Sequence, residues 1–157
     1  MDIVIKIIHK DLLKSTCNFI VHQVNCQGEM GKGIALQIAK QFPYATHWYK
    51  NKVALAKEKN ISLLGQIQVI SITGKDRQYL VNLFGQNYYG KGVQTDLTAL
   101  RQGLLKVRTL AEPSGLSVAL PYNLGCGLGG EKWENVYPII EDIFGNTNID
   151  VEICEYY

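Results

Sequence analysis

Short apolar runs rich in Val and Ile recur along the chain, and longer segments with helical periodicity separate them. Runs of this kind are typical of strands that are buried on both faces of a parallel or mixed sheet. They predict strands at Ile3–Ile8, Phe19–Val24, Gln66–Ile72, Gln78–Phe84, Ser117–Leu120 and Asp150–Cys154.

The segments between these runs carry apolar residues at helical spacing. Ile34, Ile38 and Phe42 stand four residues apart, and Pro43 ends the helix that they predict. The pattern predicts helices over Gly33–Phe42, within Tyr44–Lys59, along Leu97, Leu100, Leu104 and Val107, and through Ile139 to Gly145. Strands that alternate with helices predict a three-layer α/β/α domain, and no linker or repeat divides residues 1–157.

Composition narrows the class of protein. Hydrophobic residues make up 46% of the 157 residues, enough for a sizeable core. A net charge of +2 gives no strong attraction to nucleic acid or to an anionic membrane. The first residues alternate like a strand and are too short and too charged for a signal peptide, and no apolar run approaches the ~20 residues that span a bilayer. We expect a soluble, cytoplasmic, monomeric protein with no membrane partner.

The four cysteines lie at Cys17, Cys26, Cys126 and Cys154, and none forms a CxxC pair. Together with three scattered histidines they match no zinc spacing, so we expect free thiols and no metal site. Cys26 and Cys126 lie in glycine-rich loops and are interpreted as small loop residues, because a nucleophilic cysteine needs a histidine base.

Glycine gathers where the second predicted strand meets the first helix. The segment VNCQGEMGKGIA (residues 24–35) contains Gly28, Gly31 and Gly33. A helix N-terminus offers free N–H groups to an anion, and glycine lets a phosphate approach the backbone. Tight packing between strand and helix is the alternative interpretation.

A second glycine-rich loop, PYNLGCGLGGEKW (residues 121–133), follows another predicted strand. Two such loops predict the two walls of one cleft at the carboxyl ends of the strands, where a diphosphate would be held by backbone amides. Neither Lys32 nor Lys91 is followed by Ser or Thr, which excludes a Walker A loop. GCGLGG matches a dinucleotide fingerprint, but too little chain follows it, so a nicotinamide-dinucleotide module is a distant alternative.

The motifs HKDL, VNCQGEMGKGIALQIAKQFP and LPYNLGCGLGGEKWENVYPIIEDIF together resemble the macrodomain family, which binds ADP-ribose. The similarity covers nearly the whole chain. It is nearest the branch of terminal ADP-ribose protein glycohydrolases, antitoxins that remove ADP-ribose from DNA, and ADP-ribose-1″-phosphate phosphatases. The resemblance implies a single macrodomain with a mixed, mostly parallel central sheet.

The resemblance also implies roles for individual residues. Asp11 would accept a hydrogen bond from the adenine amine, and Asn25 would bind the distal ribose, although a turn or cap is the alternative for each. Backbone amides of both glycine loops would hold the diphosphate. No cofactor and no metal are implied. The implied ligand-binding residues are Asp11, Leu12, Asn25, Met30, Gly31, Lys32, Gly33, Ile34, Asn123, Leu124, Gly125, Cys126, Gly127 and Leu128.

The sequence departs from the family where its relatives carry catalytic groups. Gln86 stands at the position of a lysine that attacks the ribose, and Gly129 at that of an aspartate. Another hydrolase branch has an aspartate where this chain has Ala35. Neither glutamine nor glycine supplies that chemistry. The remaining mechanism is attack by a water that the bound diphosphate orients.

The residues that catalyse any such reaction stay unknown, and the candidates are Asn25, Lys32 and Asn123. The segment Gly85–Gly92 is interpreted either as a lid or substrate-contacting loop or as the turn before the third helix.

Two functional hypotheses follow, and we favour the first. In the first, the protein binds ADP-ribose and hydrolyses a derivative of it: an ester on protein, O-acetyl-ADP-ribose or ADP-ribose-1″-phosphate. In the second, it reads ADP-ribose without cutting. ADP-ribose or an ADP-ribosylated protein is the expected partner. ADP-ribosylated DNA is less favoured because the enzymes that act on it use the lysine absent at Gln86.

Overall fold

The computed structural model describes residues 4–156. The expected strand start at Ile3 therefore lies outside the described residues. In chain order the elements are β1 (Ile5–His9), η1 (Leu12–Lys14), β2 (Phe19–Val24), α1 (Gly33–Gln41), α2 (Pro43–Glu58), β3 (Ile67–Ser71), β4 (Tyr79–Phe84), α3 (Leu97–Ala111), η2 (Glu112–Ser114), β5 (Val118–Pro121), α4 (Trp133–Phe144) and β6 (Val151–Glu155).

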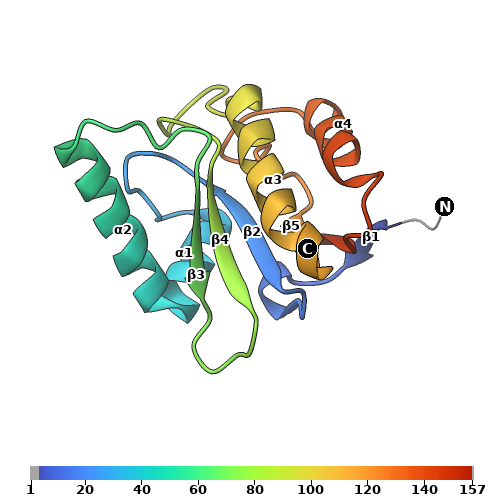
Figure 1. The fold of residues 1–157 in the computed structure, drawn as a ribbon. Helices are drawn as coiled ribbons and strands as arrows, with labels where there is room; N and C mark the ends of the chain where they lie inside the picture. The colour runs from blue at the N-terminus through green and yellow to red at the C-terminus, as the bar shows by residue number, and fades with distance from the viewer. Residues whose placement is uncertain (1–3, 157) are drawn as a thin grey trace.

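The strands form a six-stranded sheet in the order β1-β6-β5-β2-β4-β3. Every neighbouring pair is parallel except β3 and β4, which are antiparallel. The expectation of a mixed, mostly parallel sheet is confirmed. Figure 1 shows β3 at one edge of this sheet, beside α2.

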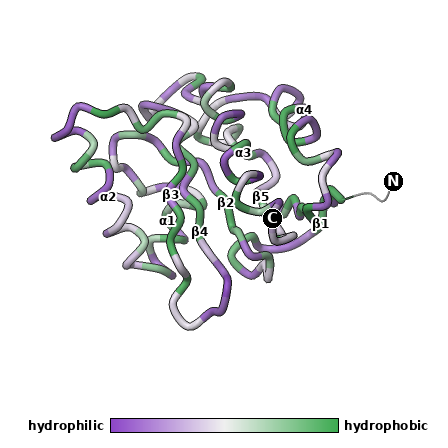
Figure 2. The backbone as a smooth tube through the Cα atoms, viewed as in Figure 1, coloured by the Kyte–Doolittle hydropathy of each residue, from purple (hydrophilic) through white to green (hydrophobic). Residues whose placement is uncertain are grey.

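Two apolar cores lie on opposite faces of the sheet. One packs α1 and α2 against it through Ile38, Tyr49 and Val53. The other packs α3 and α4 through residues such as Leu104 and Ile140. In Figure 2 the hydrophobic colour runs along β2 between these layers. The three-layer α/β/α architecture is confirmed, and its physical cause is a sheet that buries apolar side chains on both faces.

The two helix-related prolines behave differently. Pro43 is the first residue of α2, where a missing N–H costs nothing, so α2 follows α1 with only Phe42 between them. Pro138 lies inside α4, beyond its first turn, and its side chain is exposed. Water can therefore reach the carbonyl that this proline leaves without a donor.

The strands β2, β4 and β5 are parallel, so their carboxyl ends lie together along one end of the sheet. Each is followed by a loop rich in glycine or polar residues, so the topology brings these three loops together. No helix in the described part of the chain is long and apolar enough to cross a membrane.

Candidate functional site

A cavity of about 700 Å³ opens where these three loops meet. Its wall consists of the end of β2 with the loop to α1, the loop after β4, and the loop after β5. The lining residues are 22–25, 29, 31–35, 86, 89–91, 121–125 and 127–129. The two glycine loops thus face one cleft, and Tyr89, Gly90 and Lys91 bring part of the third loop to it.

Most of the residues expected at the ligand line this cavity, and four do not. Those that line it are Asn25, Gly31, Lys32, Gly33, Ile34, Asn123, Leu124, Gly125, Gly127 and Leu128. Asp11 caps η1 by accepting a hydrogen bond from the amide of Leu13. Leu12 and Met30 are buried in the core, and Cys126 turns its thiol to the carbonyl of Leu124. A ligand role stays a prediction for all fourteen residues, those in the cavity lining and these four alike.

The first wall is the N-terminus of α1. No side chain caps this helix and no acidic residue stands in its first turn. Among the described residues, none accepts a hydrogen bond from the amides of Gly33, Ile34 or Ala35, all of which line the cavity. Free amides at the positive end of a helix dipole favour an anion.

The second wall is the loop after β5. Its turns use the carbonyls of Asn123, Gly125 and Gly127. The amides of Gly125, Gly127, Leu128 and Gly129 donate to no other described residue. Gly125 has a positive φ of 73°, a conformation that favours glycine, and all four of these residues line the cavity. We call the free amides of both walls the amide cradle.

Asn25 organises the loop between β2 and α1. Its Oδ1 accepts hydrogen bonds from the amides of Gln27 and Glu29, and its Nδ2 donates to the carbonyl of Glu29. The buried Tyr49 hydroxyl lies 2.6 Å from the Asn25 carbonyl oxygen and 2.9 Å from Oδ1. This is the turn geometry weighed as the alternative from the sequence, and it leaves one N–H of Asn25 for a ligand.

Gln86, at the expected lysine position, belongs to a buried network. Its Oε1 accepts from Gln23, and its Nε2 donates to the carbonyl of Tyr88. Gln23 Nε2 also donates to the hydroxyl of Thr95, which donates to the carbonyl of Gly125. The network ties the loop after β4 to the second glycine loop.

Gly129 is part of the same junction. Its carbonyl accepts hydrogen bonds from the amides of Gln94 and Thr95. A Cβ at this position would overlap Thr95 Oγ1 and the Gly125 carbonyl oxygen. The position to which the resemblance assigns an aspartate is therefore sterically closed to a side chain in this structure.

Neither histidine nor thiol chemistry is available in the cleft. His22 is buried on β2 and bonds Asn82, and its burial lowers its pKa to about 4. Burial raises the pKa of the Cys26 thiol to about 11, and burial together with Glu131 does the same for Cys126. These thiols stay protonated near neutral pH. Among the described residues, no cluster of three or more His, Cys, Asp or Glu side chains is placed to hold a metal.

Glu29, which is not among the residues expected from the sequence, is the one carboxylate residue among those that line the cavity. Its backbone is fixed by Asn25, while the residue itself is exposed. Its place in the loop VNCQGEMGKGIA, two residues before Gly31, was the available signal. Gln23 was also missed, since it reads as an ordinary strand residue.

These features define a class: an α/β domain with two glycine loops that present backbone amides to an anionic ligand. The model of the Macro domain family matches residues 21–140, and the chain belongs to this family. The resemblance inferred from the motifs is therefore confirmed.

Two curated relatives that the chain is similar to are named as glycohydrolases that act on ADP-ribose compounds. The DNA ADP-ribosyl glycohydrolase of Mycobacterium tuberculosis is 32% identical over 127 residues, which are 80% of this chain and 34% of that protein. The chain thus spans about a third of the length of that relative. The human ADP-ribose glycohydrolase OARD1 is 25% identical over 136 residues, 85% of this chain and 79% of that protein.

Solved structures agree with the fold. The macrodomain of Mycobacterium tuberculosis DarG has a TM-score of 0.79 and 28% identity, and the match covers 97% of this chain and 96% of that one. The macrodomain of Thermus aquaticus DarG has a TM-score of 0.76 and 26% identity, with 98% and 97% covered.

Proposed function

We propose that this protein binds ADP-ribose in the cleft between its two glycine loops. The amide cradle is the observation that carries the proposal, because two loops whose backbone amides have no described acceptor line one cavity of about 700 Å³. Such a cradle suits a diphosphate without many basic side chains, and only Lys32 and Lys91 supply positive charge to the lining. The names of the curated relatives, which act on ADP-ribose compounds, support the same ligand.

The bound molecule would lie with its diphosphate in the cradle and its distal ribose near Asn25. Asn25, with its remaining N–H, lines that part of the cavity together with Glu29 and Gly31. Asp11 stays the proposed partner of the adenine, reached beyond the cavity lining. Asn123, with a positive φ of 68° and no hydrogen bond from its side chain to a described residue, would face the ligand from the other wall.

The proposed reaction is hydrolysis at the distal ribose of a mono-ADP-ribose derivative. For an ester, a water oxygen bonds to the anomeric carbon while the bond from that carbon to the ester oxygen breaks. The leaving carboxylate departs as an anion and needs no proton. The proton of the attacking water goes to Glu29, the carboxylate that lines the cavity, while the diphosphate and cradle fix the geometry.

Titration calorimetry with ADP-ribose, NAD and AMP tests the binding. ADP-ribose is expected to bind most tightly, and a preference for NAD would indicate the dinucleotide module instead. Absence of binding by all three would show that the glycine loops only pack.

Hydrolysis is tested with a panel of ADP-ribosylated peptide ester, O-acetyl-ADP-ribose and ADP-ribose-1″-phosphate. Glu29→Gln should lower kcat by about 100-fold, the usual contribution of a general base, and leave the Kd for ADP-ribose within about twofold. Glu58→Gln, at the far end of α2, is the matched control. If the protein binds ADP-ribose but cuts none of these substrates, it is a reader, which the structural use of Gln86 and Gly129 favours as the second candidate.

A further inference from the structure

The edge strand β3 has a free side. Within residues 4–156 it pairs with β4 alone, and the hydrogen bonds around it place Gln66 opposite Phe84 and Ile72 opposite Gln78. Antiparallel pairs alternate, so Gln68 and Ile70 complete the ladder to β4 while residues 67, 69 and 71 direct their N–H and C=O groups outward. No described residue pairs with these outward groups.

This edge lacks the features that usually protect one. From Asn60 to Gly74 the sequence contains no charged residue and no proline. Val69, in the middle of β3, is 41% exposed. Natural sheets block a free edge with charges, proline, a bulge or a covering segment, since an open edge recruits another strand. The open edge of β3 is therefore available to a partner chain.

A groove of about 400 Å³ runs beside this edge, between it and α2. Its wall consists of Tyr44, Trp48, residues 68–71 and Thr73, and it shares no residue with the first cavity. Trp48 is 55% exposed. Gln68 Nε2 donates to the Trp48 carbonyl at 3.0 Å, and the Thr73 amide donates to the Tyr44 hydroxyl at 3.0 Å. The groove is thus already formed, with an aromatic side chain at its rim.

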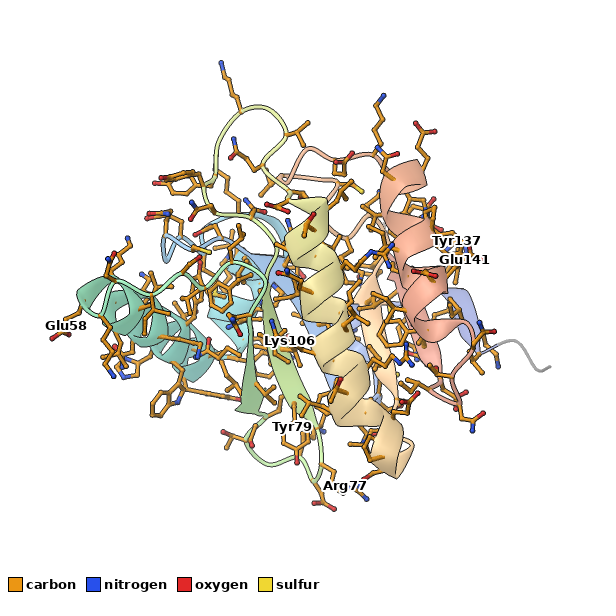
Figure 3. All side chains as sticks on the ribbon, turned by 45° about the horizontal axis from the view of Figure 1, so that its top comes forward. Glu58, Arg77, Tyr79, Lys106, Tyr137 and Glu141 are labelled. Carbon is orange, nitrogen blue, oxygen red and sulfur yellow. The ribbon has the colours of Figure 1, made fainter. Side chains whose placement is uncertain are left out.

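Charge around the groove has one dominant sign. One stripe of α2 carries Tyr44, Trp48, Lys52 and Leu55 at helical spacing, and Lys59 follows directly after the end of the helix. From Tyr44 to Arg77, the stretch that contains α2, β3 and the loop after it, the sequence has six Lys or Arg and two Asp or Glu. Figure 3 shows Arg77 at the loop that joins β3 to β4, and Thr73 of the groove belongs to the same loop.

We propose that β3 and the groove beside α2 form a docking surface for an extended, acidic polypeptide segment of a partner protein. The segment adds a seventh strand to the sheet through the outward groups of β3, places an apolar side chain against Tyr44 and Trp48, and sets its carboxylates near the lysines of α2. A second copy of this chain would bring the same basic edge against itself. A nucleic acid strand has no peptide groups with which to continue the hydrogen-bond ladder of the sheet.

The test is a selection of random 12-residue peptides displayed on phage against the full chain, with the Val69→Lys variant as counter-selection. Enriched peptides are expected to alternate apolar and acidic residues. A synthetic peptide with an enriched sequence should shift the amide NMR signals of residues 44–48 and 67–73 of the protein. Its affinity should fall about tenfold between 50 and 300 mM salt.

Variants locate the contact. Val69→Pro removes one outward N–H and no bond to β4, and should weaken the peptide about tenfold. Trp48→Ala should weaken it by a similar factor, while Leu110→Ala, an exposed leucine on α3, should not change it. An unshifted amide spectrum elsewhere shows that each variant is folded. The proposal is overturned if no peptide is enriched, if enriched peptides are basic, if their shifts fall outside β3 and α2, or if a dT12 oligonucleotide or self-association occupies this face instead.

Discussion

His22 makes the stability of the protein depend on pH in a calculable way. Asn82 Nδ2 donates to Gln68 Oε1, so the Asn82 atom that faces His22 is the acceptor Oδ1. The neutral His22 ring therefore carries its proton on Nε2. Burial lowers the pKa of His22 from 6.5 to about 4, which means that the folded protein keeps the ring neutral. Between pH 6.5 and pH 4 the His22 ring is protonated in the unfolded chain and stays neutral in the folded protein. The stabilisation is complete above pH 6.5 and is lost as the pH falls toward 4.

The size of the effect follows from the two pKa values. For 6.5 unfolded and about 4 folded, linkage gives a loss of about 2 kcal/mol in the free energy of unfolding between pH 7 and pH 5. A domain of this size is held by only ~5–15 kcal/mol, so the loss is measurable.

Urea unfolding followed by circular dichroism at pH 7, 6 and 5 measures it. Carboxylates also titrate over this range, so the comparison is with His22→Gln, whose amide can donate to Asn82 but does not titrate. The wild type should lose about 2 kcal/mol more than the variant between pH 7 and pH 5. Parallel curves for the two proteins would refute the inference that His22 is a neutral core residue.

Three further substitutions test the cleft. Gly33→Glu should abolish ADP-ribose binding in calorimetry, because a carboxylate about 4 Å from a phosphate charge costs about 4 kcal/mol. Gly33→Ala shares the backbone strain at φ +60° without the charge, so an affinity as low as that of Gly33→Glu would contradict the electrostatic cause. Gly129→Asp should lower the free energy of unfolding by about 1–3 kcal/mol without creating activity, whereas Gly127→Ala, whose Cβ meets nothing within 4 Å, should not change it. Tyr49→Phe should cost about 1–2 kcal/mol in urea unfolding and weaken ADP-ribose by loosening the Asn25 turn; unchanged values would deny that turn its support.

The helices and strands were predictable because burial leaves a local, periodic trace in sequence. The stripe of Leu97, Leu100, Leu104 and Val107 lies in α3 as expected, and the Val- and Ile-rich runs lie in the sheet. The two glycine loops were predictable for the same reason, since each follows an apolar strand and precedes a helix. The antiparallel direction of β3 left no such trace, because a buried run has the same pattern in either direction.

The sequence by itself determined the layers of the fold and the two glycine loops, and it placed Gln86 and Gly129 where the resemblance implies a lysine and an aspartate. Only the tertiary structure showed that Gln86 and Gly129 make hydrogen bonds that hold neighbouring loops together. Gln23 meets Gln86 across 63 positions of sequence, and Thr95 meets Gly125 across 30. Such contacts depend on how strands and loops converge in space, and periodicity along the chain carries no record of them. The same holds for Glu29, which becomes a candidate base only because folding places it at the cleft.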